Sequence, residues 1–148
     1  MTTTANAHGS LPPRGLWRFR ARLHGDPRVA TAPALDLGEG DTPLVPLVRW
    51  GATLGLRRVW AKLEGSNPTG SYKDRGMAVL ASVARASGAT HLVEDSSGNA
   101  GASAAAYAAR GGMTCTVYAP AAAPAAKLRQ IRAYGAELIA VSGPRSAV

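Results

Sequence analysis

The sequence is poor in the residues that build disulfides and metal centres. It has one cysteine, Cys115, which cannot form an internal disulfide and has no second cysteine or nearby histidine as a metal partner. Its three histidines, His8, His24 and His91, lie far apart in the chain, which disfavours a metal cluster or a Ser-His-Asp arrangement. A single unpaired cysteine fits a reducing compartment, so we expect a cytoplasmic protein without a metal.

Long apolar runs and acidic residues are also scarce. No stretch of about 18 uninterrupted apolar residues occurs, and the first 15 residues lack the apolar core of a secretory signal, so we expect neither export nor a membrane partner. Nine acidic residues against 17 basic ones give a net charge of +8, which raises the question of nucleic acid. Aromatic residues are only 5% of the chain and do not interleave with the arginines for base stacking. We therefore interpret the arginines as a solvated surface and expect no nucleic-acid partner.

The length of 148 residues allows one domain with a hydrophobic core. Residues 1–15 are polar and contain glycine and prolines, which predicts a disordered tail. Residues 16–56 are expected to form an extended N-terminal segment. Within that segment, residues 35–48 interrupt short apolar runs with glycines and prolines, so they should lie along another surface. Regular periodicity begins at about residue 57 and continues to residue 148.

Strand and helix patterns alternate in this last part. Alternation of apolar and polar residues predicts four strands, and apolar residues at helical spacing predict three helices. The predicted strands are residues 59–64, 90–96, 114–120 and 136–143, and the predicted helices are residues 73–87, 99–110 and 125–134. Such alternation indicates an α/β fold with a parallel sheet and helices on both faces, a three-layer αβα architecture.

Ligands of such sheets bind beyond the carboxyl ends of the strands, so the loops that leave the strands are informative. The first loop contains the turn sequence Asn-Pro-Thr-Gly, and Ser71 is a plausible N-cap that places Lys73 in the first helical turn. A lysine is unfavourable there, because the helix N-terminus carries positive partial charge. Either Lys73 is solvated and partly offset by Asp74, or the dipole and partial burial favour a neutral, nucleophilic amine.

The second loop, residues 94–101, is rich in residues that cap helices and approach ligands. Ser96, Ser97 and Asn99 can cap a helix, and Gly98 allows the backbone to come close to a ligand, so the loop is either an anion site or an ordinary capped turn. Asp95 ends its strand where a dinucleotide-binding fold places a ribose-binding acid, but no G-x-G-x-x-G motif follows the first strand.

Four stretches together resemble one known family. They read LGEGDTPLVPL, KLEGSNPTGSYKDRGM, EDSSGNAGASAAAYAARGG and KLRQIRAYGAELIAVSG, and they span roughly residues 35–143. In content and order they resemble the fold type II, or β-family, enzymes that depend on pyridoxal 5'-phosphate, and in particular the threonine synthase type. The resemblance implies that residues 57–148 form the small N-terminal domain of such an enzyme and that residues 16–56 belong to the side of the large domain.

The resemblance also implies roles for residues. Lys73 matches the lysine that forms the internal Schiff base with pyridoxal phosphate, and Asn99 matches the asparagine that bonds the ring hydroxyl of the cofactor. Ser96, Ser97, Gly98 and Asn99 would hold the carboxylate of a small amino-acid substrate. The implied activity is that of a lyase, in which O-phosphohomoserine and water give threonine and phosphate.

The chain departs from the family in two residues and in length. Ala100 stands where a threonine is common and leaves the substrate open, whereas Tyr72 replaces phenylalanine conservatively. Family members are more than twice as long, and their later chain supplies the cofactor-phosphate loop, so the resemblance implies a missing C-terminal half, a partner chain or a homo-oligomer. Two alternatives stay open: a serine/threonine dehydratase-like or other β-family lyase, and a catalytically silent fragment or interaction module.

Overall fold

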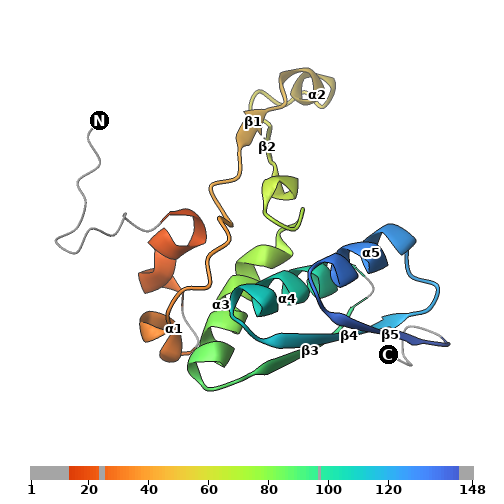
Figure 1. Cartoon of the computed structure of the whole chain (residues 1–148). Helices are drawn as coiled ribbons and strands as arrows, with labels where there is room; N and C mark the ends of the chain where they lie inside the picture. The colour runs from red at the N-terminus through yellow and green to blue at the C-terminus, as the bar shows by residue number, and fades with distance from the viewer. Residues whose placement is uncertain (1–13, 24–25, 97, 144–148) are drawn as a thin grey trace.

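The computed structural model describes residues 14–23, 26–96 and 98–143 (Figure 1). Nearly all of the predicted tail lies outside these ranges. In chain order the elements, with η for 3-10 helices, are η1 (Gly15–Arg22), α1 (Arg28–Thr31), β1 (Leu44–Pro46), α2 (Val48–Thr53), β2 (Trp60–Lys62), η2 (Glu64–Ser66), α3 (Lys73–Ala86), β3 (His91–Asp95), α4 (Asn99–Arg110), β4 (Thr114–Pro120), α5 (Ala125–Ala133) and β5 (Glu137–Val141).

The later part of the chain forms a parallel sheet in the order β3-β4-β5. Figure 1 shows α4 and α5 over the same face of this sheet, as right-handed crossovers between successive neighbouring strands require. The predicted α/β class and parallel sheet are therefore confirmed. The opposite face leaves Val93 and Tyr118 exposed, and a helical layer there stays a prediction.

The strand expected at residues 59–64 has a different partner from the predicted one. It forms β2, which pairs antiparallel with β1 in a separate two-stranded sheet, with Leu44 opposite Lys62. The prediction that it begins the parallel sheet is wrong. Alternating apolar residues indicate a strand but not its partner, and here α2 returns the chain so that β1 lies beside β2, with Pro46 opposite Trp60.

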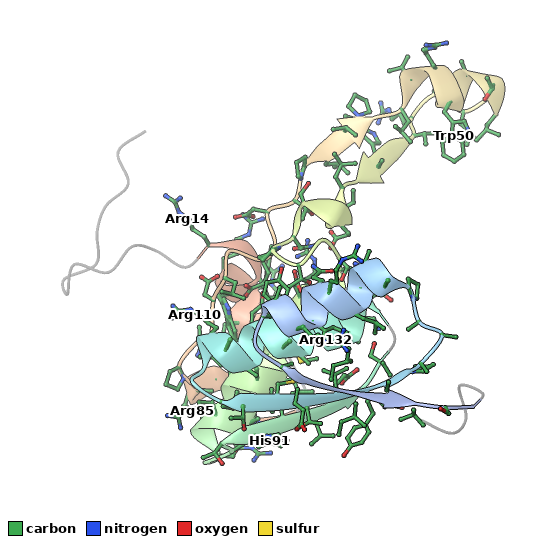
Figure 2. The ribbon with its side chains drawn as sticks, turned by 45° about the vertical axis from the view of Figure 1, so that its right-hand side comes forward. Arg14, Trp50, Arg85, His91, Arg110 and Arg132 are labelled. Carbon is green, nitrogen blue, oxygen red and sulfur yellow. The ribbon has the colours of Figure 1, made fainter. Side chains whose placement is uncertain are left out.

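The strands β1 and β2 and the helix α2 form an arm that projects from the rest of the molecule, with Trp50 near its tip (Figures 1 and 2). Large apolar side chains on this arm are more than half exposed; they are Leu44, Val48, Trp50, Leu54, Leu56 and Trp60. So many exposed large apolar residues in one short segment are uncommon on an isolated domain. The arm therefore carries many of the exposed large apolar residues of the described chain, whereas the buried core packs around α4.

Helix α4 is the centre of the core because its side chains are small. Its residues from Gly101 to Ala108 are all buried, and the helix packs against α3, α5, β3 and β4. A helix that is apolar on every side belongs in an interior, and alanines let its neighbours approach closely. Tyr107, Val117 and Ile131 supply the bulk of this core. No helix among the described residues has the length and apolarity that a membrane span requires.

Two helical glycines give a matched test of this packing. A Cβ added at Gly101 would lie 2.9 Å from Val117 Cγ1 and 3.1 Å from both Ile131 Cδ1 and Ser96 O, whereas one added at Gly76 would meet nothing within 4 Å. We expect Gly101→Ala to lower the free energy of unfolding by about 1–2 kcal/mol, because overpacking exceeds the gain in helix propensity. Gly76→Ala should raise it by about 0.5–1 kcal/mol. Urea unfolding measures both, and equal effects of the two variants would contradict the packing described.

Candidate functional site

The first turns of α3 and α4 bring the two predicted loops together. Lys73 is the first residue of α3 and Asn99 is the first residue of α4, as the sequence predicted. Asp74, in the first turn of α3, accepts a hydrogen bond of 2.6 Å from Ser103 Oγ on α4. The two helix N-termini are therefore neighbours, and each presents backbone N–H groups that no helical carbonyl accepts.

The turn before Lys73 is held by the same carboxylate. Asp74 Oδ2 accepts from the Thr69 N–H at 2.7 Å, and Asp74 Oδ1 accepts from Thr69 Oγ1 at 2.5 Å. Gln130 on α5 donates from Nε2 to Thr69 O at 2.9 Å. Ser71 accepts from the Lys73 N–H at 3.2 Å, although the residue directly before the helix is Tyr72. The loop is thus bonded directly to α3 and α5, and Asp74 links it to α4 through Ser103.

A second network bonds the lysine segment to the opening segment of the chain. Arg75 donates from Nε and Nη2 to the two carboxylate oxygens of Glu64, both at 2.8 Å. Thr42 Oγ1 and Asn67 Nδ2 also donate to Glu64, and the Gly40 N–H donates to Asn67 Oδ1. The hydrogen bonds from Arg75, with those from Thr42 and Asn67, lower the pKa of Glu64 to about 2 against the opposing effect of burial.

The described residues include all three lysines of the chain. Among them, Lys73 is the one whose amine makes no hydrogen bond within the described residues. Lys62 Nζ donates to Thr42 O, and Lys127 Nζ donates to Gln130 Oε1. Lys73 Nζ lies 5.1 Å from the centroid of the Tyr72 ring, and its side chain is exposed. Of the two alternatives for Lys73, the structure favours the solvated side chain over partial burial, because the helix begins where the chain emerges at the surface. Its amine is accessible to a ligand.

The second loop contributes an unsatisfied polar atom. Asn99 Oδ1 is buried and has no hydrogen-bond partner among the described residues, an arrangement that costs free energy unless a donor binds there. Ser96 is buried at the end of β3 and its Oγ accepts from the Gly98 N–H at 3.2 Å, which leaves the hydroxyl hydrogen for another acceptor. A Cβ at Gly98 would meet nothing within 4 Å, so this backbone faces open space. The fourth predicted residue, Ser97, lies outside the described residues.

The arrangement suits a ligand with a carbonyl group and a hydrogen-bond donor. It offers a free amine at Lys73, an unpaired acceptor at Asn99 and a hydroxyl at Ser96 beside a helix N-terminus. No hydrogen bond joins Lys73 to Asn99 or Ser96 within the described part of the chain. The structure therefore brings these residues to adjacent helix ends, and they do not interact directly.

Sequence reasoning missed the residues that hold the loop. Thr69, Ser103 and Gln130 were not predicted to matter, and Asp74 was considered only as a charge beside Lys73. An acidic residue in a first turn ordinarily signals helix stabilisation at the surface, whereas Asp74 is fully buried. Its donors come from residues five positions before it and 29 positions after it, so local spacing carried no sign of the cluster.

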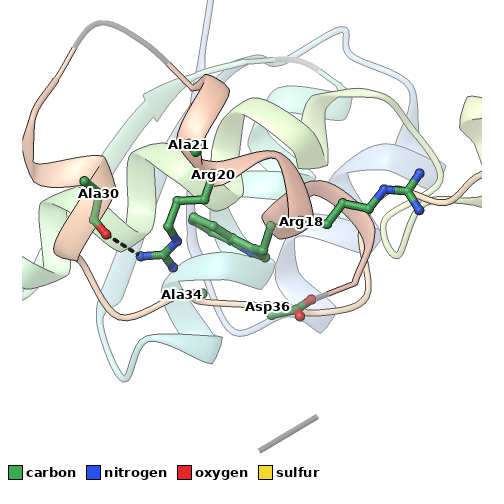
Figure 3. A pocket seen from close by; sticks show the side chains of 7 residues that line it. Arg18, Arg20, Ala21, Ala30, Ala34 and Asp36 are labelled. Atoms are coloured by element: carbon green, nitrogen blue, oxygen red, sulfur yellow. Dashed lines mark hydrogen bonds between the residues drawn. The ribbon is translucent and has the colours of Figure 1, made fainter. Parts of the chain in front are cut away.

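A cavity of about 630 Å³ lies elsewhere, between η1 and α1 (Figure 3). Arg20 extends across it and donates from Nη1 to Ala30 O at 3.2 Å and to Ala32 O at 2.7 Å, while its guanidinium lies 4.7 Å from the centroid of the Trp17 ring. None of Lys73, Ser96 or Asn99 lines this cavity. Arg20 holds η1 to the segment around α1 through these hydrogen bonds. The cavity is separate from the site of the two loops.

Comparison with known proteins supports one family. Residues 35–148 match the family model described as pyridoxal-phosphate dependent enzyme. The threonine synthase of Bacillus sp. is 47% identical over 112 residues, which cover 75% of this chain and 32% of the relative. The threonine synthase of Methanocaldococcus jannaschii is 41% identical over 130 residues, which cover 87% of this chain and 31% of the relative. The chain spans about a third of the length of these curated relatives.

Solved structures are similar as well. A pyridoxal 5'-phosphate-dependent aspartate racemase aligns with a TM-score of 0.65 and 31% identity, over 72% of this chain and 34% of that one. A hydrogen sulfide-producing enzyme from Fusobacterium nucleatum aligns with a TM-score of 0.53 and 32% identity, over 57% of this chain and 27% of that one. These similarities agree with the α/β fold described above.

The Glu64–Arg75 pair predicts a pH-dependent stability. Because folding lowers the pKa of Glu64 from 4.5 to about 2, the stabilisation is fully present above about pH 4.5 and is lost as the pH falls towards 2. We expect Glu64→Gln to lower the free energy of unfolding by about 1–2 kcal/mol at neutral pH, a value reduced for partial exposure. Denaturant unfolding across this pH range measures the difference, with Arg75→Gln and the double variant completing the cycle. A difference that does not change with pH would contradict the ion pair.

Proposed function

The chain belongs to the family of pyridoxal-phosphate dependent enzymes, and we propose that it acts in a lyase reaction of threonine synthase type, in which O-phosphohomoserine and water give threonine and phosphate. The family follows from the match over residues 35–148, and the reaction is suggested by threonine synthases at 41–47% identity. The observation that carries the proposal is that two neighbouring helix N-termini present an accessible amine at Lys73 and a buried oxygen at Asn99 that has no donor among the described residues.

The residues present fit the cofactor. Lys73 Nζ is an accessible amine that would hold pyridoxal phosphate through its aldehyde carbon. Asn99 Oδ1 has no donor among the described residues, and it could accept a hydrogen bond from the ring hydroxyl of the cofactor. When bound, the cofactor would supply a ring that withdraws electrons from the substrate carbon bearing the amino group. The chain's own contribution is to orient that ring and to move protons.

The substrate carboxylate would lie at the N-terminus of α4. Ser96 can donate its hydroxyl hydrogen, and the first backbone N–H groups of α4 lie at the positive end of the helix dipole. Gly98 leaves open space in which an anion can approach the backbone. Ser97 is proposed as a further contact on the family resemblance alone. Lys73, once exchanged for the substrate amine, would be free to take or give a proton at the reacting carbon.

A second candidate is a lyase or dehydratase acting on serine or threonine. Ala100, the second residue of α4, offers a methyl group where threonine synthases commonly carry a hydroxyl, so one contact to the substrate is absent. The likenesses to a racemase and to a hydrogen sulfide-producing enzyme show that the same fold accompanies other reactions. The absence of a hydroxyl at Ala100 is the specific observation that favours this candidate.

Trapping the cofactor tests the site directly. We expect pyridoxal phosphate followed by borohydride, which reduces the C=N bond, to label Lys73 several times more than Lys62 or Lys127, because those two amines are hydrogen-bonded to the protein. Peptide mass spectrometry measures the three positions in one molecule. Lys73→Arg is the control and should leave only the background at the other two lysines. Equal labelling of all three lysines would contradict the proposed function.

The reaction products separate the two candidates. With pyridoxal phosphate present, release of inorganic phosphate from O-phosphohomoserine, absent in Lys73→Ala, is expected for the threonine synthase type. Release of ammonia from serine or threonine, with no phosphate from O-phosphohomoserine, would instead support the second candidate. Turnover that persists in Lys73→Ala would contradict both.

A further inference from the structure

Hydrogen bonds from the turn that precedes Lys73 reach two helices, α3 and α5. Thr69 is 3% exposed, and its N–H, hydroxyl and carbonyl all have partners. The first two donate to Asp74, and the carbonyl accepts from Gln130 on α5. A surface turn ordinarily leaves such groups to water. In this turn, the three polar groups of Thr69 are all bonded to the protein.

The carboxylate at its centre is unusual in its surroundings. Asp74 is fully buried, and it accepts three hydrogen bonds, from the Thr69 N–H, Thr69 Oγ1 and Ser103 Oγ. All three donors are uncharged, and none of the ion pairs of the described residues includes Asp74. Burying a carboxylate without a cation is costly, and the three donors must offset that cost. An apolar residue would fill the same space more cheaply, so stability alone does not account for Asp74.

The bonds of Asp74 determine where Lys73 can lie. Ser71 and Asp74 are buried, whereas the two residues between them, Tyr72 and Lys73, are exposed. Lys73 therefore emerges from the surface between two fixed points. Its main chain cannot turn away unless the contacts of Asp74 break.

The same bonds relate Lys73 to Asn99. Ser103 lies four residues after Asn99 on α4, so the two side chains are on one face of the helix and about one turn apart, about 6 Å along its axis. Side chains on a helix point towards its N-terminus, which directs Ser103 towards the turn that begins with Asn99. The path from the lysine to the asparagine is thus short: Lys73 adjoins Asp74, Asp74 bonds Ser103, and Ser103 lies one turn from Asn99.

We propose that Thr69, Asp74 and Ser103 are positioning residues, which set the direction of the Lys73 amine relative to Asn99. The three residues touch neither cofactor nor substrate and act through the backbone of the lysine loop. The inference rests on the proposed function, because it concerns how the lysine of that function is held. Loosening the cluster should lower the ability of Lys73 to capture pyridoxal phosphate while the fold stays intact.

Three variants and one control test the proposal on the full chain. Ser103→Ala removes the donor on α4, and Thr69→Val removes the hydroxyl donor with little change in volume, whereas Thr69→Ser keeps it. The control is Ser82→Ala: Ser82 is as buried as Ser103, bonds Ala78 O and the Leu35 N–H, and lies on α3 outside the cluster. Each protein is treated with pyridoxal phosphate and borohydride, and labelling at Lys73 is divided by labelling at Lys127. Thermal melting confirms that each variant is folded at the temperature of the assay.

We expect Ser103→Ala and Thr69→Val to lower the labelling ratio about tenfold, the effect of losing a hydrogen bond to a charged group. Ser82→Ala should leave the ratio unchanged even where its melting temperature falls as far, and Thr69→Ser should restore it. Ratios in Ser103→Ala and Thr69→Val equal to that of Ser82→Ala would overturn the positioning role and leave the proposed function intact. Should Ser103→Ala fail to fold, the Thr69→Val and Thr69→Ser pair decides the question alone. An unvaried chain with no preference for Lys73 would overturn the function and the positioning role together.

Discussion

The buried carboxylate of Asp74 is the constraint on which the geometry of the site depends. It closes a tight turn through Thr69 and reaches a second helix through Ser103, so one side chain holds the lysine loop to α3 and α4. Because three uncharged donors surround it, its negative charge is stabilised by fixed dipoles and not by a mobile cation. A lysine or arginine partner would have brought a second flexible side chain into the interior. The turn before Lys73 is therefore held by hydrogen bonds from its backbone and its side chain.

The rest of the fold provides the conditions for that contact. The small residues of α4 allow α3 and α5 to pack closely, which brings Ser103 within reach of Asp74 and Gln130 within reach of Thr69. The opening segment is held against the same loop by Thr42, which bonds both members of the Glu64–Arg75 ion pair. Beside this centre, the exposed Lys73 amine and the buried Asn99 oxygen make no hydrogen bond within the described residues, and a ligand can bind both.

Much of this could be predicted from the sequence, because periodicity reports local structure. Helices α3, α4 and α5 and strands β3, β4 and β5 lie within a few residues of their predicted positions, and Lys73 begins its helix as expected. The resemblance in four motifs gave the family, which the match over residues 35–148 confirms. What could not be predicted depends on contacts between distant residues. The pairing of β2 with β1, the burial of Asp74 and its bond to Ser103 leave no periodic signal, and the exposure of Lys73 depends on how the whole loop is placed.

Asp74 holds the lysine loop rigidly, and hydrogen exchange at one amide tests this most directly. The Thr69 N–H lies in a turn, where amides ordinarily exchange quickly, but it donates to a fully buried carboxylate. Under native conditions we predict that it exchanges as slowly as the buried amides of α4. Exchange as fast as that of the exposed Tyr72 in the same loop would contradict the account, because the turn would then open without breaking the core.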